Sequence, residues 1–394
     1  MIAAVGMAPL LGSVAGAVEG IMQATPGSTP SGKVPRRILG KTGLSLPVVC
    51  MGGGFNKPPE RARGLEWGIN HFDTAASYGG GEVGIARFMR EYKIPRDKIT
   101  ITTKPADINT PLPIISDIEK SLDKSLTDLG TDYIDIFCGV HACPRPDRLT
   151  DELQGFAEEQ KKKGKIRFFG FSNHVNMADN LTKASTLPWI DVILLQYNYR
   201  LAGNTKLSAA IDAAVKAGIG LIAIKTQGFG AKTMTEAETK LTEAFTGKGF
   251  TEAQAKIKYV LEDQRITSAA IGMKGMDIID SCAAAALDKV SLTPDTKTAL
   301  EQHAQETCSG YCAGCPNICG AALPAGLPMM SDVMRFLMYS ESYKEHDYAR
   351  ELFHRFPEEA KAGMLAADYS LAETLCPQRI PIAGMVAEAF HRFA

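Results

Sequence analysis

Residues Gly68-Ile69-Asn70-His71-Phe72-Asp73-Thr74-Ala75-Ala76-Ser77-Tyr78-Gly79 contain a short strand-like run that gives way to small and polar residues. Asn70–Asp73 predicts a strand that ends at Asp73, and Tyr78 follows five residues later. In parallel barrels the active residues lie on the loops after the carboxyl ends of the strands. This segment is therefore the first place to look for chemistry.

The same arrangement recurs from Leu44 onward, where short strand-like runs alternate with longer segments of helical period. The eight predicted strands are Val48–Met51, Asn70–Asp73, Ile99–Thr103, Tyr133–Val140, Ile166–Phe171, Val192–Gln196, Leu221–Ile224 and Ala269–Gly272. The predicted helices include Ile114–Leu129, Asp151–Lys163, Met177–Thr186, Lys206–Ala217, Glu252–Gln264 and Asp277–Leu287. Eight β/α units in roughly 250 residues predict a closed (β/α)8 TIM barrel. An open doubly wound sheet is disfavoured, because Met51-Gly52-Gly53-Gly54 lacks the Gly-x-Gly-x-x-Gly spacing.

The length of the chain and its balance of charge limit the class of partner. With 394 residues the chain can form one large domain and an appendage. The formal net charge of −1 argues against nucleic acid and anionic membranes as main partners, because those surfaces select for a basic excess. A small molecule is the expected partner.

The sequence divides into three parts: residues 1–34 are an apolar leader and linker, 35–294 the barrel, and 295–394 a small, mostly helical, cysteine-rich extension. Met1–Ala24 contains no Lys or Arg and is too short and glycine-broken to span a bilayer, so no stable membrane span is expected. It resembles the apolar half of an export signal without the positive start. The protein is expected in the cytoplasm as written, and in the periplasm if a twin-arginine segment precedes Met1.

Four polar residues at or after the ends of predicted strands form the candidate catalytic set: Asp73, Tyr78, Lys104 and His141. Together with Gly68–Gly79 and Leu129-Gly130-Thr131-Asp132-Tyr133-Ile134-Asp135, they resemble the aldo-keto reductase family in order and spacing. The resemblance runs from about Arg36 to about Leu287. It implies a (β/α)8 barrel and an oxidoreductase that interconverts a small-molecule carbonyl and an alcohol with NADP or NAD.

The chemistry of such a reaction explains the residue types. A developing alkoxide needs a proton, and an ordinary tyrosine, with a pKa of ~10, is a poor donor near neutrality. A nearby Lys104 ammonium would favour the tyrosinate form of Tyr78, and Asp73 would hold that lysine in place. His141 would polarise the carbonyl oxygen. The alternative is a purely structural role, in which Asp73 and Lys104 form a buried ion pair beside an ordinary tyrosine.

The resemblance also assigns residues to the cofactor. It implies that Ser172, Asn173 and Gln196 hold the nicotinamide carboxamide, although Ser172 would serve equally as a helix N-cap. After the last strand, the Gly272-Met273-Lys274-Gly275 turn suits a phosphate. The usual grip on a 2′-phosphate is reduced to Lys274, so NADP is favoured over NAD by this lysine alone.

The C-terminal extension carries cysteines with the spacing C-x3-C-x2-C-x3-C, and a Cys-Pro pair follows near the end of the chain. This layout resembles the ferredoxin-like tail of a subset of aldo-keto reductases and predicts a 4Fe-4S cluster. Cys308, Cys312 and Cys315 are the expected first three ligands, and Cys376 is favoured over Cys319 as the fourth. A four-thiolate zinc site and disulfides remain as alternatives.

These features favour an NAD(P)H-dependent aldo-keto reductase. A cluster in the C-terminal extension would allow electron exchange with a partner protein. The alternative is a redox-sensing or regulatory protein on the same barrel that binds the nucleotide with little turnover.

Overall fold

A computed structural model describes residues 32–54, 56–106, 114–232, 235–245 and 250–394. The predicted apolar leader and most of the linker that follows it lie outside these residues. Where the chain is described, none of its helices is both long and apolar enough to cross a membrane.

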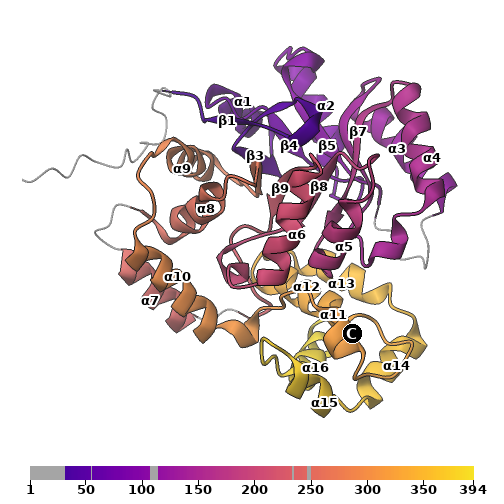
Figure 1. Ribbon diagram of the computed structural model, residues 1–394, viewed down its shortest axis with the longest axis vertical. Coiled ribbons are helices and arrows are strands. Elements are labelled where there is room, and N and C mark those ends of the chain that lie inside the picture. The colour runs from indigo at the N-terminus through magenta and orange to yellow at the C-terminus, as the bar shows by residue number, and fades with distance from the viewer. Residues whose placement is uncertain (1–31, 55, 107–113, 233–234, 246–249) are drawn as a thin grey trace, which may run out of the picture.

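Eight parallel strands close into a barrel in which neighbours in sequence are neighbours in space, and the last strand pairs with the first. They are β3 (Val49–Gly52), β4 (His71–Asp73), β5 (Thr100–Thr103), β6 (Ile134–Val140), β7 (Ile166–Asn173), β8 (Val192–Gln196), β9 (Gly220–Ile224) and β10 (Ser268–Ile271). Each predicted strand overlaps one of these, so the predicted (β/α)8 barrel is confirmed (Figure 1).

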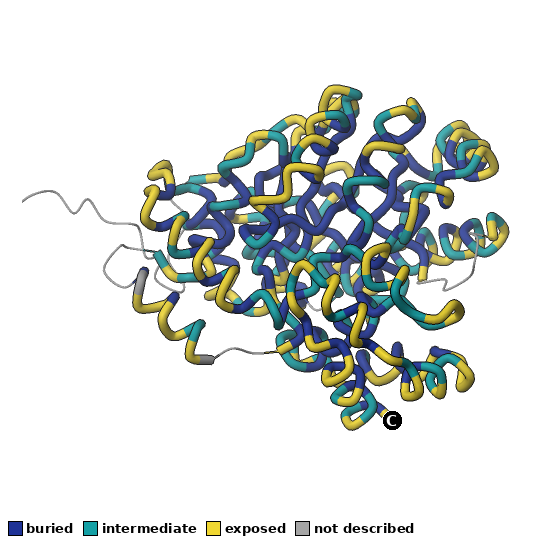
Figure 2. The backbone as a smooth tube through the Cα atoms, turned by 60° about the horizontal axis from the view of Figure 1, so that its bottom comes forward, coloured by how far each residue is buried: buried dark blue, intermediate teal, exposed yellow. Residues whose placement is uncertain are grey.

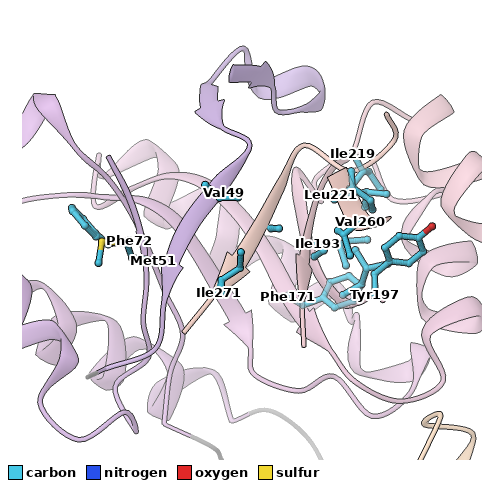
Figure 3. Close-up of a cluster of buried hydrophobic side chains, with 14 of the residues drawn as sticks. Val49, Met51, Phe72, Phe171, Ile193, Tyr197, Ile219, Leu221, Val260 and Ile271 are labelled. Carbon is cyan, nitrogen blue, oxygen red and sulfur yellow. The ribbon is translucent and has the colours of Figure 1, made fainter. Parts of the chain in front are cut away.

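The alternation of side chains along each strand builds two apolar layers. Cys50, Val192 and Ile222 belong to a cluster that fills the barrel. Their neighbours Val49 and Ile193 point the other way and pack in the layer between strands and helices (Figure 3). The strands are accordingly buried on both faces, and exposed residues gather on the outer helices (Figure 2).

The predicted helices are present with small shifts at their ends: α3 (Ile115–Leu129), α4 (Asp151–Lys162), α5 (Met177–Ala184), α6 (Thr205–Lys216), α8 (Glu252–Glu262) and α9 (Met276–Leu287). The structure adds α1 (Pro58–Glu66), α2 (Gly81–Glu91) and α7 (Thr235–Phe245). It also adds a hairpin, β1 (Arg36–Ile38) with β2 (Ser45–Pro47). Leu39 and Leu46 of this hairpin region are fully buried in the cluster that fills the barrel.

After the barrel, α10 (Pro294–Glu306) packs with α7 through a cluster that includes Leu300 and Phe245. A domain boundary at residues 294 and 295 stays a prediction.

The rest of the chain forms a helical unit with its own apolar core (Figure 1). Its helices are α11 (Pro316–Gly320), α12 (Met330–Glu341), α13 (His346–His354), α14 (Glu358–Ala366), α15 (Ser370–Leu375) and α16 (Ile382–Phe393). This unit is the cysteine-rich helical extension that the sequence predicts.

Candidate active site

Asp73 and Lys104 meet because β4 and β5 are adjacent parallel strands that end at the same edge of the barrel. Lys104 is only 1% exposed, and its Nζ donates to Asp73 Oδ1 at 2.6 Å and to the Thr74 carbonyl oxygen at 2.7 Å. A buried ammonium is stable only with such partners. The pair therefore fixes one positive charge at the end of the barrel.

Tyr78 and His141 lie beside this pair. The Lys104 Nζ is 5.2 Å from the centroid of the Tyr78 ring, and the rings of Tyr78 and His141 meet edge to face with centroids 5.8 Å apart. Nδ1 of His141 is 3.1 Å from the Pro105 carbonyl oxygen. That oxygen can only accept, so Nδ1 carries a proton in this contact, and a second donor at Nε2 requires the imidazolium form. All four residues of the candidate catalytic set thus lie together.

The residues expected to hold a nicotinamide differ in how many of their hydrogen-bonding groups already have a partner within the chain. Ser172 Oγ accepts a hydrogen bond from the Ala142 amide at 2.8 Å, so it already serves the backbone. Asn173 Oδ1 accepts from the Val175 amide at 3.2 Å, whereas the buried Asn173 Nδ2 has no partner among the described residues. An orphaned buried amide donor is costly unless a ligand accepts from it. Asn173 therefore fits a carboxamide.

Gln196 and Lys274 are both engaged by the extension. Gln196 Nε2 donates to the Tyr311 hydroxyl at 2.7 Å, and Lys274 Nζ forms an ion pair with Glu345 at 2.5 Å. Beyond Gly272 there is open space where a side chain would begin. The residues thus fit a nicotinamide cofactor once Tyr311 and Glu345 release these two side chains.

Backbone contacts hold the extension against the loops that follow β7 and β9. The Asn176 amide donates to the Gly314 oxygen at 2.8 Å, and the Ala231 amide donates to the Gly310 oxygen at 2.7 Å. Tyr311 lies between these contacts in sequence and is 3% exposed. Sequence reasoning missed its role, because no local signal shows that a residue of the extension reaches Gln196.

Four of the five cysteines in the extension line one pocket, together with apolar side chains such as Ile380 and Met334: Cys312, Cys315, Cys319 and Cys376. Cys308 is not among the lining residues, and its Sγ accepts a hydrogen bond from Arg379 Nη2 at 3.2 Å. The structure thus gathers both residues considered for the fourth ligand and sets the expected first ligand aside. The remaining cysteines, Cys50, Cys138, Cys143 and Cys282, are buried core residues.

The pocket holds thiols that are hard to ionise without a metal. Burial, followed by the charge of the neighbouring thiols, raises the pKa of Cys312 to about 12 and that of Cys315 to about 11. None of the nine cysteines, all of which are described, forms a disulfide. No three His, Cys, Asp or Glu side chains within the described ranges already stand in metal-coordinating geometry. Four thiols around a single pocket nevertheless match the donor set of an iron–sulfur cluster, whose core is wider than a single ion.

Comparisons with known proteins show the family of the chain and the fold of its barrel. The protein-family model described as "Aldo/keto reductase family" matches residues 62–305, more than half of the chain. Relatives include L-galactose dehydrogenase of Arabidopsis thaliana, 24% identical over 69% of this chain and 94% of its own length. L-glyceraldehyde 3-phosphate reductase of Escherichia coli O157:H7 is 26% identical over 69% of this chain and 93% of its own length. A holo aldo-keto reductase from Bacillus halodurans shares the fold, with a TM-score of 0.56 and 21% identity over 68% of this chain and 96% of that one.

Proposed function

Because this chain belongs to the aldo/keto reductase family, whose members are NAD(P)H-linked oxidoreductases, we propose that it interconverts a small carbonyl compound and its alcohol with Tyr78 as proton donor and acceptor. The observation that carries the proposal is the Lys104 ammonium, which is paired with Asp73 and lies 5.2 Å from the Tyr78 ring. A fixed positive charge favours the tyrosinate and so makes the phenol a usable acid near neutral pH.

Each residue then has a distinct task. Asp73 holds Lys104, Lys104 stabilises the phenolate, and His141 polarises the carbonyl oxygen. When bound, the nicotinamide supplies or accepts the hydride. Asn173 is the best-supported contact for its carboxamide, with Ser172 and Gln196 beside it. Gly272 and Lys274 would face a phosphate, and Lys274 favours NADP over NAD.

The test of this proposal replaces Tyr78 with Phe. We expect kcat for NADPH-dependent aldehyde reduction to fall by about 10²- to 10⁴-fold, the contribution typical of a general acid. Tyr92→Phe is the control, because Tyr92 is 42% exposed and lies at the end of α2, away from the ion pair. The assay follows NADPH absorbance over a panel that begins with small hydroxyaldehydes, in view of the two enzymes named above. Turnover of the Tyr78→Phe protein at the original rate contradicts the assignment.

We further propose that the extension binds a 4Fe-4S cluster through Cys312, Cys315, Cys319 and Cys376. The pocket that these four residues line supports this set. The contact between Cys308 and Arg379 argues against the ferredoxin order, in which Cys308 is the first ligand. Zinc in the same pocket is the alternative.

Metal analysis of anaerobically purified variants tests the cluster. We expect about four iron atoms per chain in the unmodified protein. The Cys319→Ser protein should lose most of this iron, whereas the Cys308→Ser protein should keep it. Loss of iron from the Cys308→Ser protein and its retention in the Cys319→Ser protein would show that Cys308, and not Cys319, is a ligand, as in the ferredoxin order. Stoichiometric zinc in place of iron would refute the cluster.

A further inference from the structure

A second pocket lies where the extension meets the barrel, next to the cysteine pocket but distinct from it. From the barrel it is lined by His174, Gln196 and Lys225, and from α12 by Arg335 and Met334. Cys312, Ser331 and Met334 line both pockets. None of the groups assigned above to proton transfer lines this second pocket.

Lys225 follows directly after β9, and its amine has no carboxylate partner among the described residues. It makes no ion pair with any carboxylate in the described ranges, and its Nζ lies over the rings of Tyr339 and Tyr343, 4.6 and 4.7 Å from their centroids. Aromatic faces attract a cation but do not replace a counter-ion. Its backbone φ of +56° adds a conformation that is unfavourable for a residue with a side chain.

The neighbouring charged groups do not supply Lys225 with a counter-ion. Arg335, 17% exposed at its side chain, pairs with Asp332 at 2.6 Å, and the nearby Asp73 is already paired with Lys104. Burial, followed by the charges of Arg335 and Lys104, lowers the pKa of Lys225 to about 7. The 7%-exposed His174 also lines the pocket, and its Nδ1 has no partner among the described residues.

We propose that this pocket binds a small anionic group, a carboxylate or a phosphate, between Lys225 and Arg335. An anion there would favour the protonated form of Lys225, give that ammonium a partner, and accept a hydrogen bond from a proton on His174 Nδ1. Lys104 and Asp73 are close enough to affect Lys225, so the pocket adjoins the candidate active site. The next step rests on the proposed function: the anionic group is part of the carbonyl substrate, and Lys225 selects substrates that carry such a group.

Binding of inorganic phosphate to the full-length protein tests the pocket without any turnover. We expect phosphate to raise the melting temperature of the wild-type and Lys225→Arg proteins. In Lys225→Met its affinity, measured by calorimetry, should fall at least tenfold. The Lys225→Met protein should also melt at a higher temperature than wild type without phosphate, because it lacks an amine that is removed from water without a polar partner among the described residues. Lys206→Met removes a lysine whose side chain is 72% exposed and should change neither result. Equal phosphate affinity in wild type and Lys225→Met overturns the proposal.

A pair of aldehydes identifies the source of the anion. Succinate semialdehyde and butanal differ in a terminal carboxylate, so Lys225→Met should lower kcat/KM at least tenfold for the first and less than twofold for the second. If phosphate binding depends on Lys225 but the two aldehydes respond alike, the site takes a free anion and the substrate assignment is overturned. If no aldehyde is reduced, the proposed function fails while the phosphate result still decides whether the pocket binds an anion.

Discussion

His71 lies two residues before Asp73 on β4 and is buried as a neutral imidazole. It is fully inaccessible, its Nε2 lies 2.8 Å from Thr102 Oγ1, and burial lowers its pKa from 6.5 to about 4. The folded state therefore resists protonation while the unfolded chain accepts a proton near pH 6.5. The contribution of His71 to the free energy of unfolding is therefore fully present above pH 6.5 and is lost as the pH falls toward 4. A difference of about 2.5 pKa units corresponds to about 3 kcal/mol.

Replacing His71 with Gln should remove most of this pH dependence and keep a polar group facing Thr102. The free energy of unfolding in urea, measured from pH 7 to pH 4, should fall less steeply in the variant. A smaller slope persists in it, because burial also lowers the pKa of His174. Identical slopes in the variant and the wild type would show that His71 titrates alike in the folded and unfolded chains.

At the scale of single elements, β7 depends on a glycine where it pairs with β8. Gly170 stands opposite Val192, and a Cβ at this position would lie 1.9 Å from the Val192 carbonyl oxygen. Gly170→Ala should therefore destabilise the protein by about 3 kcal/mol, since a barrel strand must move. Gly155→Ala is the matched control: this glycine is exposed on α4 with open space around it, and the change should stabilise by about 0.5–1 kcal/mol. Urea unfolding measures both, and a Gly170→Ala protein as stable as wild type contradicts the close approach.

The elements also show what local sequence can predict. The barrel strands are predictable because each is an apolar run buried on both faces, and β8 matches its predicted bounds at both ends. The β1–β2 hairpin has three-residue strands, too short for a periodic signal. The candidate catalytic set is predictable because its four residues lie at or after strand ends and together resemble the aldo-keto reductase pattern in order and spacing. In contrast, the choice between Cys308 and Cys319 depends on the path of the chain around a pocket, and the spacing of cysteines does not contain that path.

At the scale of the whole molecule, the extension contacts side chains that the proposed function assigns to the cofactor. Gln196 and Asn198 both donate to the Tyr311 hydroxyl, at 2.7 and 3.0 Å. Long-range contacts of this kind join residues more than a hundred positions apart, so no sequence window predicts them. If binding of a nicotinamide requires Gln196 to be released, the free energy of that hydrogen bond is subtracted from the affinity.

Removal of the Tyr311 hydroxyl should therefore tighten nucleotide binding. One hydrogen bond of about 1 kcal/mol predicts a roughly fivefold lower Kd for NADPH in Tyr311→Phe, measured by fluorescence titration. Glu345→Gln, which breaks the ion pair with Lys274, should act in the same direction and more strongly on NADPH than on NADH, because Lys274 is the residue that would face a 2′-phosphate. Tyr369→Phe is the control, since the Tyr369 hydroxyl donates to the Met364 oxygen within the extension and contacts no barrel residue through that bond. A folded Tyr311→Phe protein that binds NADPH more weakly than wild type would mean that Tyr311 helps to form the nucleotide site instead of competing for it.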